Sequence, residues 1–495
     1  MAACCNVLTV GKSYKIMKYE VVIGLETHTE LATASKLWCS CPTVFGAPPN
    51  TQVCPVCLGM PGVLPVLNKK ALEYRLKASL ALNCRINLFS TFDRKNYYYP
   101  DLPKNYQISQ NHLNLGVGGY VEIRSNGGVK KININNVHLE EEAGKLVHPE
   151  DASADYSLVD FNRAGVPLLE IVTEPDMRSL EEVEQFMQTL RNILLYNEVS
   201  DCKMQEGSLR FEASISLRPV GQKKLGSRVE MKNLNSMKAV LKALEYEINR
   251  QTGVLDSGGK VDMETRLWDE VRERTERMRT KEEAHDYRYF PEPDLVPMVI
   301  EERWLGELRS MLPELPLTRR NRFVEVYSLS DYDAGVLTED KAVADYFERC
   351  VELHAAPKSL CNWITNDVLR ELKERRLGIR DFKVRPEALV GLVVMVEKGT
   401  VSMPTAREVF ADMASSGSDA AKIVEEKGLL QISDREELER LVLKVLDDNP
   451  SAVSDYQKGK KTALGFLVGQ VMRQSTGKAN PKMVNEVLIQ KLKTN

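Results

Sequence analysis

The sequence lacks any apolar run that approaches the ~20 residues a helix needs to cross a membrane. It also lacks an excess of charge of one sign, because 67 Lys and Arg stand against 70 Asp and Glu, a formal net charge of −3. Taken as an average, this balance argues against a strongly basic nucleic-acid-binding protein. Apolar and charged fractions of 43% and 28% are ordinary for globular chains and exclude a disordered or fibrous protein.

Familiar motifs for nucleotides and nucleophiles are missing too. Residues 6–13 differ from a phosphate-binding P-loop because Asn6 stands where that motif has its first glycine. No G-x-G-x-x-G sequence opens a βαβ unit, and there is no G-x-S-x-G turn of an α/β-hydrolase. If the protein uses ATP, the sequence predicts a binding site of another kind.

Residues 1–17 are interpreted as an N-terminal extension. No clear basic region precedes their short apolar segment, as a secretory signal would require. Three lysines by position 18 and no arginine do not fit a transit peptide. We therefore expect a bacterial, cytoplasmic protein and treat an organelle as the weaker alternative.

The remaining chain divides into three expected domains, as a length of 495 residues suggests. Residues 18–310 alternate short strands with Gly, Pro and Asn turns, which predicts a strand-rich α+β domain. Helical spacing predicts two helices within it, over 180–194 and from Met237, after an Asn235/Ser236 cap.

The two later domains are expected to be all-α. A Pro-rich passage ends the first domain, and nearly continuous helical periodicity follows it. We expect a helical domain over residues 311–425 and a smaller helical tail domain over residues 426–495.

Four of the ten cysteines lie close together in the sequence. Cys39 and Cys41 precede Cys54 and Cys57, and the second pair sits in the Gly/Pro-rich segment CPVCLGMPG. Two close thiol pairs on either side of a loop can close a tetrahedral zinc site. Because four thiolates leave no open coordination position, the predicted role of zinc is structural. The alternative is four unrelated thiols.

Two strand segments combine histidine with glutamate. In VVIGLETHTEL, alternation places Glu26 and His28 on one strand face, and in VHLEEEAGK it places His138 with Glu140 and leaves Glu141 on the opposite face. Such faces suit a hard cation or acid–base chemistry. An exposed acidic strand edge is the alternative.

Three further strands each carry one notable glutamate. Glu170 lies in the apolar run VPLLEIV, where a buried carboxylate needs a metal or a basic partner. Glu212 in RFEASISLR and Glu230 in RVEMKNL lie on the polar faces of amphipathic strands. Together these carboxylates predict an oxygen-rich sheet surface of the kind that magnesium prefers.

Residues 92–110 interleave tyrosines and basic residues with prolines. This segment suits nucleotide or RNA contact, and a packed aromatic turn is the alternative. Its cations Arg94, Lys95 and Lys104 are the candidate ATP-binding residues.

Long segments of the chain resemble the GatB family, the B subunits of heterotrimeric aspartyl/glutamyl-tRNA amidotransferases. The resemblance runs from about Tyr19 to the C-terminus. It rests on the segments VVIGLETHTEL, FDRKNYYYPDLPKNYQISQ, VHLEEEAGK, SLVDFNRAGVPLLEIVTEPD, KMQEGSLRFEASISLRP, EMKNLNS, DYRYFPEPDL, YQKGKKTALGFLVGQVM and GKANPKMVNEVL.

The resemblance implies a function that the residues alone do not name. Members use ATP and Mg²⁺ to phosphorylate the side-chain carboxylate of misacylated Glu-tRNA(Gln) or Asp-tRNA(Asn). Ammonia made from glutamine by the A subunit then displaces the phosphate, and a small C subunit braces the complex. The implied fold is a cradle-shaped catalytic domain, a helical domain and a helical tail that binds the tRNA.

The resemblance also assigns residues. His28, Glu141 and Glu170 correspond to the ligands of one Mg²⁺, and Glu26, Glu212 and Glu230 to a second Mg²⁺ site or acidic cluster. Only part of the family has the four cysteines, so the implied activity does not require zinc. One conflict stands: strict alternation puts Glu140 and Glu141 on different faces of the strand, so only one of them can face His28. We follow the family and expect Glu141, and a β-bulge in this strand would reverse the choice between Glu140 and Glu141.

Split by segment, the charge balance looks different. From Asp455 to the C-terminus there are eight Lys or Arg and two Asp or Glu, a net charge of +6, which leaves −9 for the first 454 residues. A basic tail of this kind is predicted to contact tRNA phosphates. Its candidate residues are Lys458, Lys460, Lys461, Arg473, Lys478 and Lys482.

Two other functions remain open at this point. One is a zinc-stabilised tRNA-binding scaffold whose chemistry lies in a partner. The weaker one is a self-sufficient amidase, for which the sequence offers no credible Ser/Lys signature.

Overall fold

A computed structural model describes residues 18–125, 127–149, 155–280, 286–429, 435–460, 462–475 and 479–494. The N-terminal extension, Lys461 and Lys478 lie outside these ranges. The chain divides into two compact units, Met1–Leu317 and Thr318–Asn495. Each is described by itself.

The first unit is built on one large, mostly antiparallel sheet. Its strand order is β15-β14-β13-β12-β1-β11-β8-β6-β2, with β7 paired to β8. Among the strand pairs of the described residues, only β13 with β14 is parallel. The strands of this sheet are β1 (Tyr19–Glu30), β2 (Arg85–Ile86), β6 (Gly116–Val117), β7 (Tyr120–Ser125), β8 (Gly128–Glu141), β11 (Pro167–Thr173), β12 (Leu209–Pro219), β13 (Val229–Lys232), β14 (Glu264–Asp269) and β15 (Arg274–Thr280).

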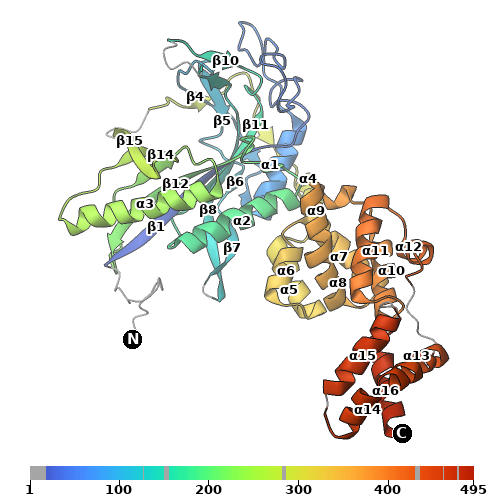
Figure 1. The fold of residues 1–495 in the computed structure, drawn as a ribbon. Coiled ribbons are helices and arrows are strands. Elements are labelled where there is room, and N and C mark those ends of the chain that lie inside the picture. Colours follow the sequence, from blue (N-terminus) through green and yellow to red (C-terminus); the bar gives the residue numbers. More distant parts are fainter. Residues whose placement is uncertain are drawn as a thin grey trace. The chain divides into compact units, whose positions relative to one another are not determined.

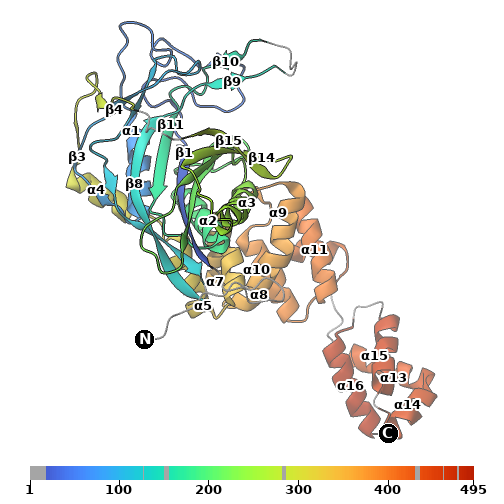
Figure 2. The ribbon, with the colours of Figure 1, turned by 90° about the vertical axis from the view of Figure 1, so that its left-hand side faces the viewer.

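Three small sheets flank it. Figure 2 shows the β9–β10 hairpin and β4 near one end of the large sheet. They are formed by β9 (Lys145–Val147) with β10 (Leu158–Asp160), by β4 (Asp93–Asn96) between β5 (Tyr106–Ser109) and β16 (Phe290–Pro291), and by β3 (Phe89–Ser90) with β17 (Met298–Val299).

Two helices cover one face of the large sheet, α2 (Leu180–Tyr196) and α3 (Met237–Asp256), as Figure 1 shows. Both begin at a serine whose side chain accepts a backbone N–H bond, Ser179 for α2 and Ser236 for α3. The two helices predicted from periodicity and the Ser236 cap are therefore confirmed.

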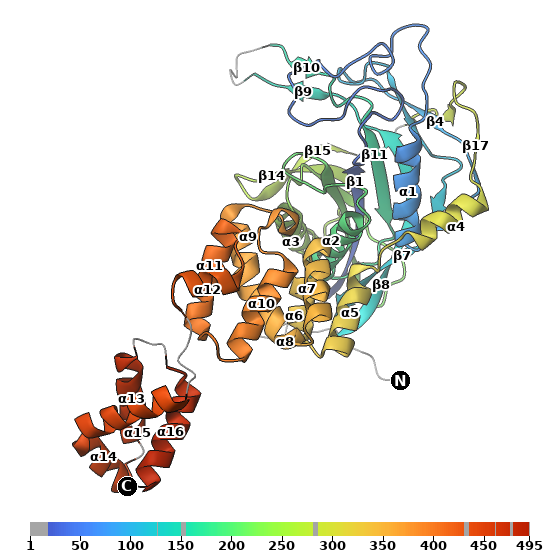
Figure 3. The ribbon, with the colours of Figure 1, turned by 90° about the vertical axis from the view of Figure 1, so that its right-hand side faces the viewer.

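Alternation along β1 decides which side chains the helices cover. The odd-numbered Val21, Ile23 and Leu25 are buried in one hydrophobic core with residues of α2 and α3 such as Phe186 and Leu244. The even-numbered side chains therefore project from the opposite face. Two more helices complete the unit and contact each other, α1 (Lys69–Ala81) and α4 (Glu302–Ser310), as Figure 3 shows.

From α5 onward the chain is helical, so the predicted α+β class is confirmed. These elements are α5 (Pro316–Tyr327), α6 (Asp331–Leu337), α7 (Lys341–Leu353), α8 (Pro357–Trp363), the π-helix η1 (Ile364–Val368), α9 (Leu369–Arg375), the 3₁₀ helix η2 (Ile379–Asp381), α10 (Pro386–Glu397), α11 (Met403–Ser416), α12 (Ala420–Glu426), α13 (Arg435–Asp448), α14 (Pro450–Gln457), α15 (Thr462–Gln474) and α16 (Pro481–Thr494).

Two separate hydrophobic cores stabilise this helical part. One runs from Phe323 to Val424, and the other, from Leu438 to Leu492, holds α13, α15 and α16 together. The expected domain limits at 310/311 and 425/426 stay predictions. Among the described residues, no helix is both long enough and apolar enough to span a bilayer.

Candidate functional site

The candidate site lies on the polar face of the three adjacent strands β11, β1 and β8. The strand register places His28 of β1 opposite Glu170 of β11, and Glu170 opposite His138 of β8. Residues directly opposite in antiparallel strands project to the same face. The fold therefore builds a cross-strand row of two imidazoles with one carboxylate between them.

Short distances join this row to two more carboxylates. His28 Nε2 lies 3.3 Å from Glu170 Oε2, 3.6 Å from Glu26 Oε1 and 3.9 Å from Glu140 Oε1. His138 Nε2 lies 3.1 Å from Glu170 Oε2 and 3.8 Å from Glu140 Oε2. We call these five residues the Glu/His cluster.

The cluster contains two overlapping groups of metal-ligand type. The ligand atoms of Glu26, His28 and Glu170 lie within 4.8 Å of one another, as do those of His138, Glu140 and Glu170. Carboxylate oxygens and imidazole nitrogens at these separations fit a divalent cation.

Opposite charges within the cluster shift the pKa values of its members. Burial would raise the pKa of Glu170, but the charges and hydrogen bonds of His138 and His28 hold it well below its usual range. Burial would lower the histidine pKa values, but Glu170 and Glu140 raise that of His28 to about 8 and that of His138 to about 10. For Glu26, burial and the nearby Glu170 charge raise the pKa to about 7.

Glu141 does not belong to the cluster, contrary to expectation. Its side chain pairs with Lys104 and accepts a hydrogen bond from the backbone N–H of Ile108 at 3.0 Å. The β8–β11 register is regular from Pro167 to Val172, and the only irregularity there lies after Val172, so no bulge turns Glu141 toward His28. Strict alternation therefore puts Glu140 in the cluster, where Ser109 Oγ donates to it at 3.2 Å.

The second expected group, around Glu212 and Glu230, is held by a lysine. Register places Glu212 opposite Glu26, and Lys232 Nζ lies 2.7 Å from Glu212 Oε2 and 3.4 Å from Glu230 Oε1. These two glutamates are therefore neighbours of the cluster, and Lys232 balances part of their charge.

A cavity of about 570 Å³ opens beside the cluster. Of the candidate nucleotide-binding cations, only Lys95 lines it. Burial would lower the Lys95 pKa, but the charges of Glu140, Tyr289 and Glu170 raise it, so the ammonium is retained. The cavity is lined by Glu26, Asn87, Lys95, Ser109, Gln110, Asn111, His112, Asn114, Val117, Asn135, Asn136, His138, Glu170, Tyr287 and Tyr289.

The other two candidate cations are engaged elsewhere. Arg94 forms two hydrogen bonds with Glu292, at 2.7 and 2.8 Å, and a third with Asp294 at 3.1 Å. Lys104 is paired with Glu141.

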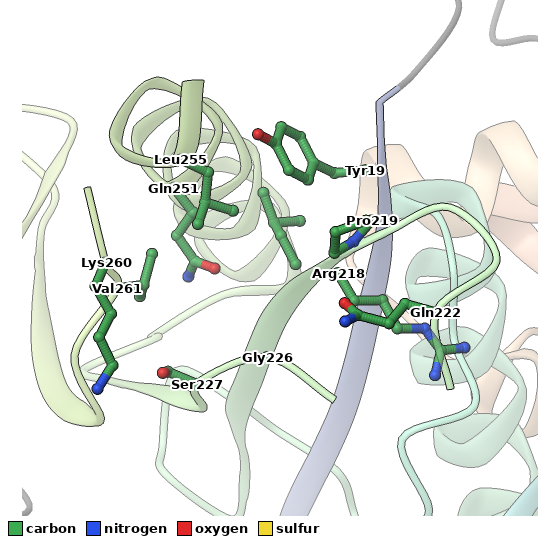
Figure 4. A pocket seen from close by; sticks show the side chains of 11 residues that line it. Tyr19, Arg218, Pro219, Gln222, Gly226, Ser227, Gln251, Leu255, Lys260 and Val261 are labelled. Atoms are coloured by element: carbon green, nitrogen blue, oxygen red, sulfur yellow. The ribbon is translucent and has the colours of Figure 1, made fainter. Parts of the chain in front are cut away.

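A smaller cavity, of about 220 Å³, lies where β1 begins and α3 ends (Figure 4). It is bordered by Tyr19, Gln251 and Leu255, among others, and no His, Cys, Asp or Glu of the described residues lines it. It lacks the histidine and carboxylate side chains that line the larger cavity.

The four cysteines of the predicted zinc site do come together. Their sulfur atoms all lie within 4.8 Å of one another. A hydrogen bond from Cys39 and the charge of Lys36 lower the pKa of the Cys57 thiol to about 4, although burial opposes this. The buried Lys36 ammonium lies 3.5 Å from Cys57 Sγ, a contact that sequence reasoning missed. Four sulfur atoms so close together, with a lysine beside one of them, fit a zinc site.

The candidate tRNA-binding cations that the structure describes are exposed. Lys458 and Lys460 follow α14, Arg473 lies in α15 and Lys482 in α16. Lys460 pairs with Asp455 at 3.1 Å.

Comparison with known proteins covers both units. The chain matches the family described as the GatB/GatE catalytic domain over residues 21–306 and the one described as the GatB domain over residues 345–492. The relatives below are all aspartyl/glutamyl-tRNA(Asn/Gln) amidotransferase subunits B.

The protein of Caldanaerobacter subterraneus subsp. tengcongensis is 55% identical over 476 residues, which cover 96% of this chain and 100% of the relative. That of Carboxydothermus hydrogenoformans is also 55% identical over 476 residues, 96% of this chain and 99% of the relative. That of Brevibacillus brevis is 52% identical over 471 residues, 95% of this chain and 98% of the relative.

Proposed function

The chain belongs to the GatB family, and we propose that it is the B subunit of a glutamine-dependent tRNA amidotransferase. In this role it uses ATP to phosphorylate the side-chain carboxylate of Glu-tRNA(Gln) or Asp-tRNA(Asn). Ammonia from an A subunit then replaces the phosphate and gives the amide, and a small C subunit completes the complex. Its relatives are bacterial tRNA amidotransferase subunits, which supports a cytoplasmic site of action.

The Glu/His cluster carries this proposal. Transfer of a phosphoryl group to a carboxylate brings two anionic groups together, and their repulsion must be offset. His28, Glu140 and Glu170, with Glu26 and His138 beside them, would hold Mg²⁺, which when bound would neutralise the phosphate oxygens. Once both imidazoles have lost their protons, the three carboxylates leave the cluster anionic enough to attract a divalent cation.

Residues that line the cavity can position the substrate phosphate beside the Glu/His cluster. Lys95 retains its ammonium and lines the cavity, so it can direct an anionic phosphate toward the cluster. The volume of about 570 Å³ lies within the usual range for small-molecule sites. Residues of β4, β5 and the segment around Tyr287 line the cavity together with residues of the large sheet.

Two further parts of the proposal lie outside the cavity. A structural Zn²⁺ is bound by Cys39, Cys41, Cys54 and Cys57. Exposed cations of the tail, with Lys458 and Arg473 among them, contact tRNA phosphates.

Cleavage of ATP tests the function. In the assembled heterotrimer, ATP cleavage that depends on Glu-tRNA(Gln) is measured for the wild type and for Glu170→Ala. We expect a loss of about 100-fold or more, because even the outer partners of metal ligands are worth 10–100-fold. Glu181→Gln, an exposed change on the covering helix α2, is the control and should retain the wild-type rate.

Equal rates for the wild type and Glu170→Ala would remove Glu170 from the mechanism. Normal amide formation after removal of the whole cluster would instead favour a zinc-stabilised tRNA-binding scaffold. Glutamine hydrolysis by the isolated chain would favour a self-sufficient amidase.

A further inference from the structure

His112 and Asp93 form an oriented pair at the wall of the cavity. His112 Nδ1 lies 2.8 Å from Asp93 Oδ1, and the Asp93 side chain is fully buried. Asp93 Oδ2 accepts the backbone N–H bonds of Asn111 at 2.7 Å and His112 at 3.0 Å. These bonds fix the carboxylate, which in turn fixes the imidazole ring.

The arrangement selects one tautomer of His112. An ionised carboxylate only accepts hydrogen bonds, so Nδ1 carries the proton that Asp93 receives. The lone pair of the neutral ring then lies on Nε2. Among the described residues, Nε2 has no hydrogen-bond partner, and 53% of the His112 side chain is exposed.

His112 borders the same cavity as the Glu/His cluster. It lines the space together with Glu26, His138 and Glu170 of the cluster, and with Lys95. The Tyr289 ring packs edge-on against the imidazole, with 6.5 Å between the ring centroids. The titratable groups that contact His112 or line this cavity with it are thus Asp93, Lys95, Tyr287, Tyr289, Glu26, His138 and Glu170.

The other titratable groups of the cavity are less suited to accept a proton. Lys95 stays protonated beside the carboxylates, and Glu26, His138 and Glu170 belong to the proposed metal site. Of the two histidines that line the cavity in the described residues, His112 alone stands outside the cluster.

We propose that His112 is the general base of the amide-forming step and that Asp93 is its positioning residue. The inference rests on the proposed function. The ammonia nitrogen attacks the carbonyl carbon of the acyl phosphate, and a C–N bond forms. The C–O bond to phosphate breaks, and its electron pair leaves with the phosphate oxygen. The nitrogen loses one proton to His112 Nε2, which later passes it to water or the departing phosphate.

The Asp93 carboxylate makes this proton transfer easier. It stabilises the imidazolium that forms, and it holds the ring in the tautomer whose Nε2 can accept a proton, as the aspartate of a catalytic triad does. General base catalysis of this kind contributes about 10²–10⁴-fold to a rate.

The test is the ratio of amide formed to ATP cleaved, measured in the assembled heterotrimer with Glu-tRNA(Gln). Ammonium chloride replaces glutamine, and the free ammonia concentration is held constant across the pH range. For the wild type, we expect the ratio of amide formed to ATP cleaved to rise with pH. His112→Gln should lower this ratio about 100-fold and abolish its rise with pH. Asp93→Asn should lower it in the same direction, because an asparagine favours the wrong tautomer. His148→Gln, on the exposed β9–β10 hairpin, is the matched control and should keep the wild-type ratio.

Binding of Mn²⁺ to the cluster separates chemistry from structure. We expect His112→Gln to bind Mn²⁺ within threefold of the wild type. A ratio within threefold of the wild type, or loss of Mn²⁺ binding together with amide formation, would overturn the role of His112. A wild-type complex that cleaves no ATP in response to Glu-tRNA(Gln) would overturn the proposed function itself.

Discussion

At the residue scale, the carboxylates of the cluster favour the protonated form of its two imidazoles. The pKa of His28 is raised to about 8 and that of His138 to about 10, so both imidazoles are largely protonated at neutral pH. A ring nitrogen must lose its proton before it can bind a metal. Cation binding therefore competes with protons at this site.

We accordingly expect Mn²⁺ affinity to rise from pH 6.5 to pH 9. Below the pKa of a ligand, each released proton weakens binding by up to about tenfold per pH unit. Glu26, with its pKa raised to about 7, acts in the same direction. Titration calorimetry in two buffers of different ionisation enthalpy measures both the affinity and the released protons. His28→Gln should flatten the rise, and an affinity independent of pH would contradict the proposed ligand set.

The adjacent pair Glu140 and Glu141 gives a second prediction. Glu140→Gln should weaken Mn²⁺ binding by about 100-fold, because a cluster carboxylate is removed. Glu141→Gln should leave Mn²⁺ affinity nearly unchanged, yet it leaves the largely buried Lys104 ammonium without its partner. Breaking a buried ion pair costs about 3–5 kcal/mol. Urea unfolding should show this decrease in stability for Glu141→Gln, and the reverse pattern would restore Glu141 as the ligand.

At the scale of secondary-structure elements, the sequence predicted local features well. Alternation correctly assigned the faces of β1 and β8, including the separation of Glu140 from Glu141. Helical spacing and the preference for serine at a helix start correctly placed Ser236 at the start of α3. These features depend on neighbouring residues and on a strand period of two, so local pattern suffices to find them.

Pairing between distant segments could not be predicted. The sequence does not tell that β1 lies between β12 and β11, which is what brings His28 next to Glu170. The sequence also could not show that His112 forms a hydrogen bond with Asp93 of β4. That contact depends on the path of the loop that carries His112 back toward β4. The structure groups Glu140, not Glu141, with His138 and Glu170, and the spacing of His138 and Glu140 on one strand face was the sequence signal for this. The ligand role that the resemblance gives to Glu141 stays a prediction.

The four-cysteine segment is an element whose metal can be measured directly. Purified protein should contain about one zinc per chain, and Cys54→Ser/Cys57→Ser should lose it, because a thiolate site needs all its ligands. Cys350→Ala/Cys361→Ala changes two buried cysteines of the helical part and should retain zinc. Atomic emission spectroscopy gives the metal content, and wild-type protein without zinc would reduce the segment to four free thiols.

At the scale of the whole molecule, charge is divided between the ends of the chain. The first 454 residues carry −9, and the stretch from Asp455 onward carries +6. The near-neutral net charge of the whole chain thus hides two parts of opposite charge. The basic stretch from Asp455 onward can attract a polyanion such as tRNA, and the acidic first 454 residues do not. Electrostatic attraction to phosphates comes with release of counterions, so its strength depends on salt.

We therefore expect the tail cations to set the salt dependence of tRNA binding. Alanine at Lys458, Lys460, Arg473 and Lys482 should weaken binding at low salt. It should also lower the slope of log affinity against log salt by up to about one for each phosphate that the tail no longer neutralises. A matched variant with alanine at the exposed Lys358, Lys373, Lys398 and Lys422 removes the same charge outside the tail. Filter binding from 50 to 300 mM KCl, about the range in which such attraction weakens, compares the two. If both variants reduce the slope equally, net charge rather than the tail surface controls binding.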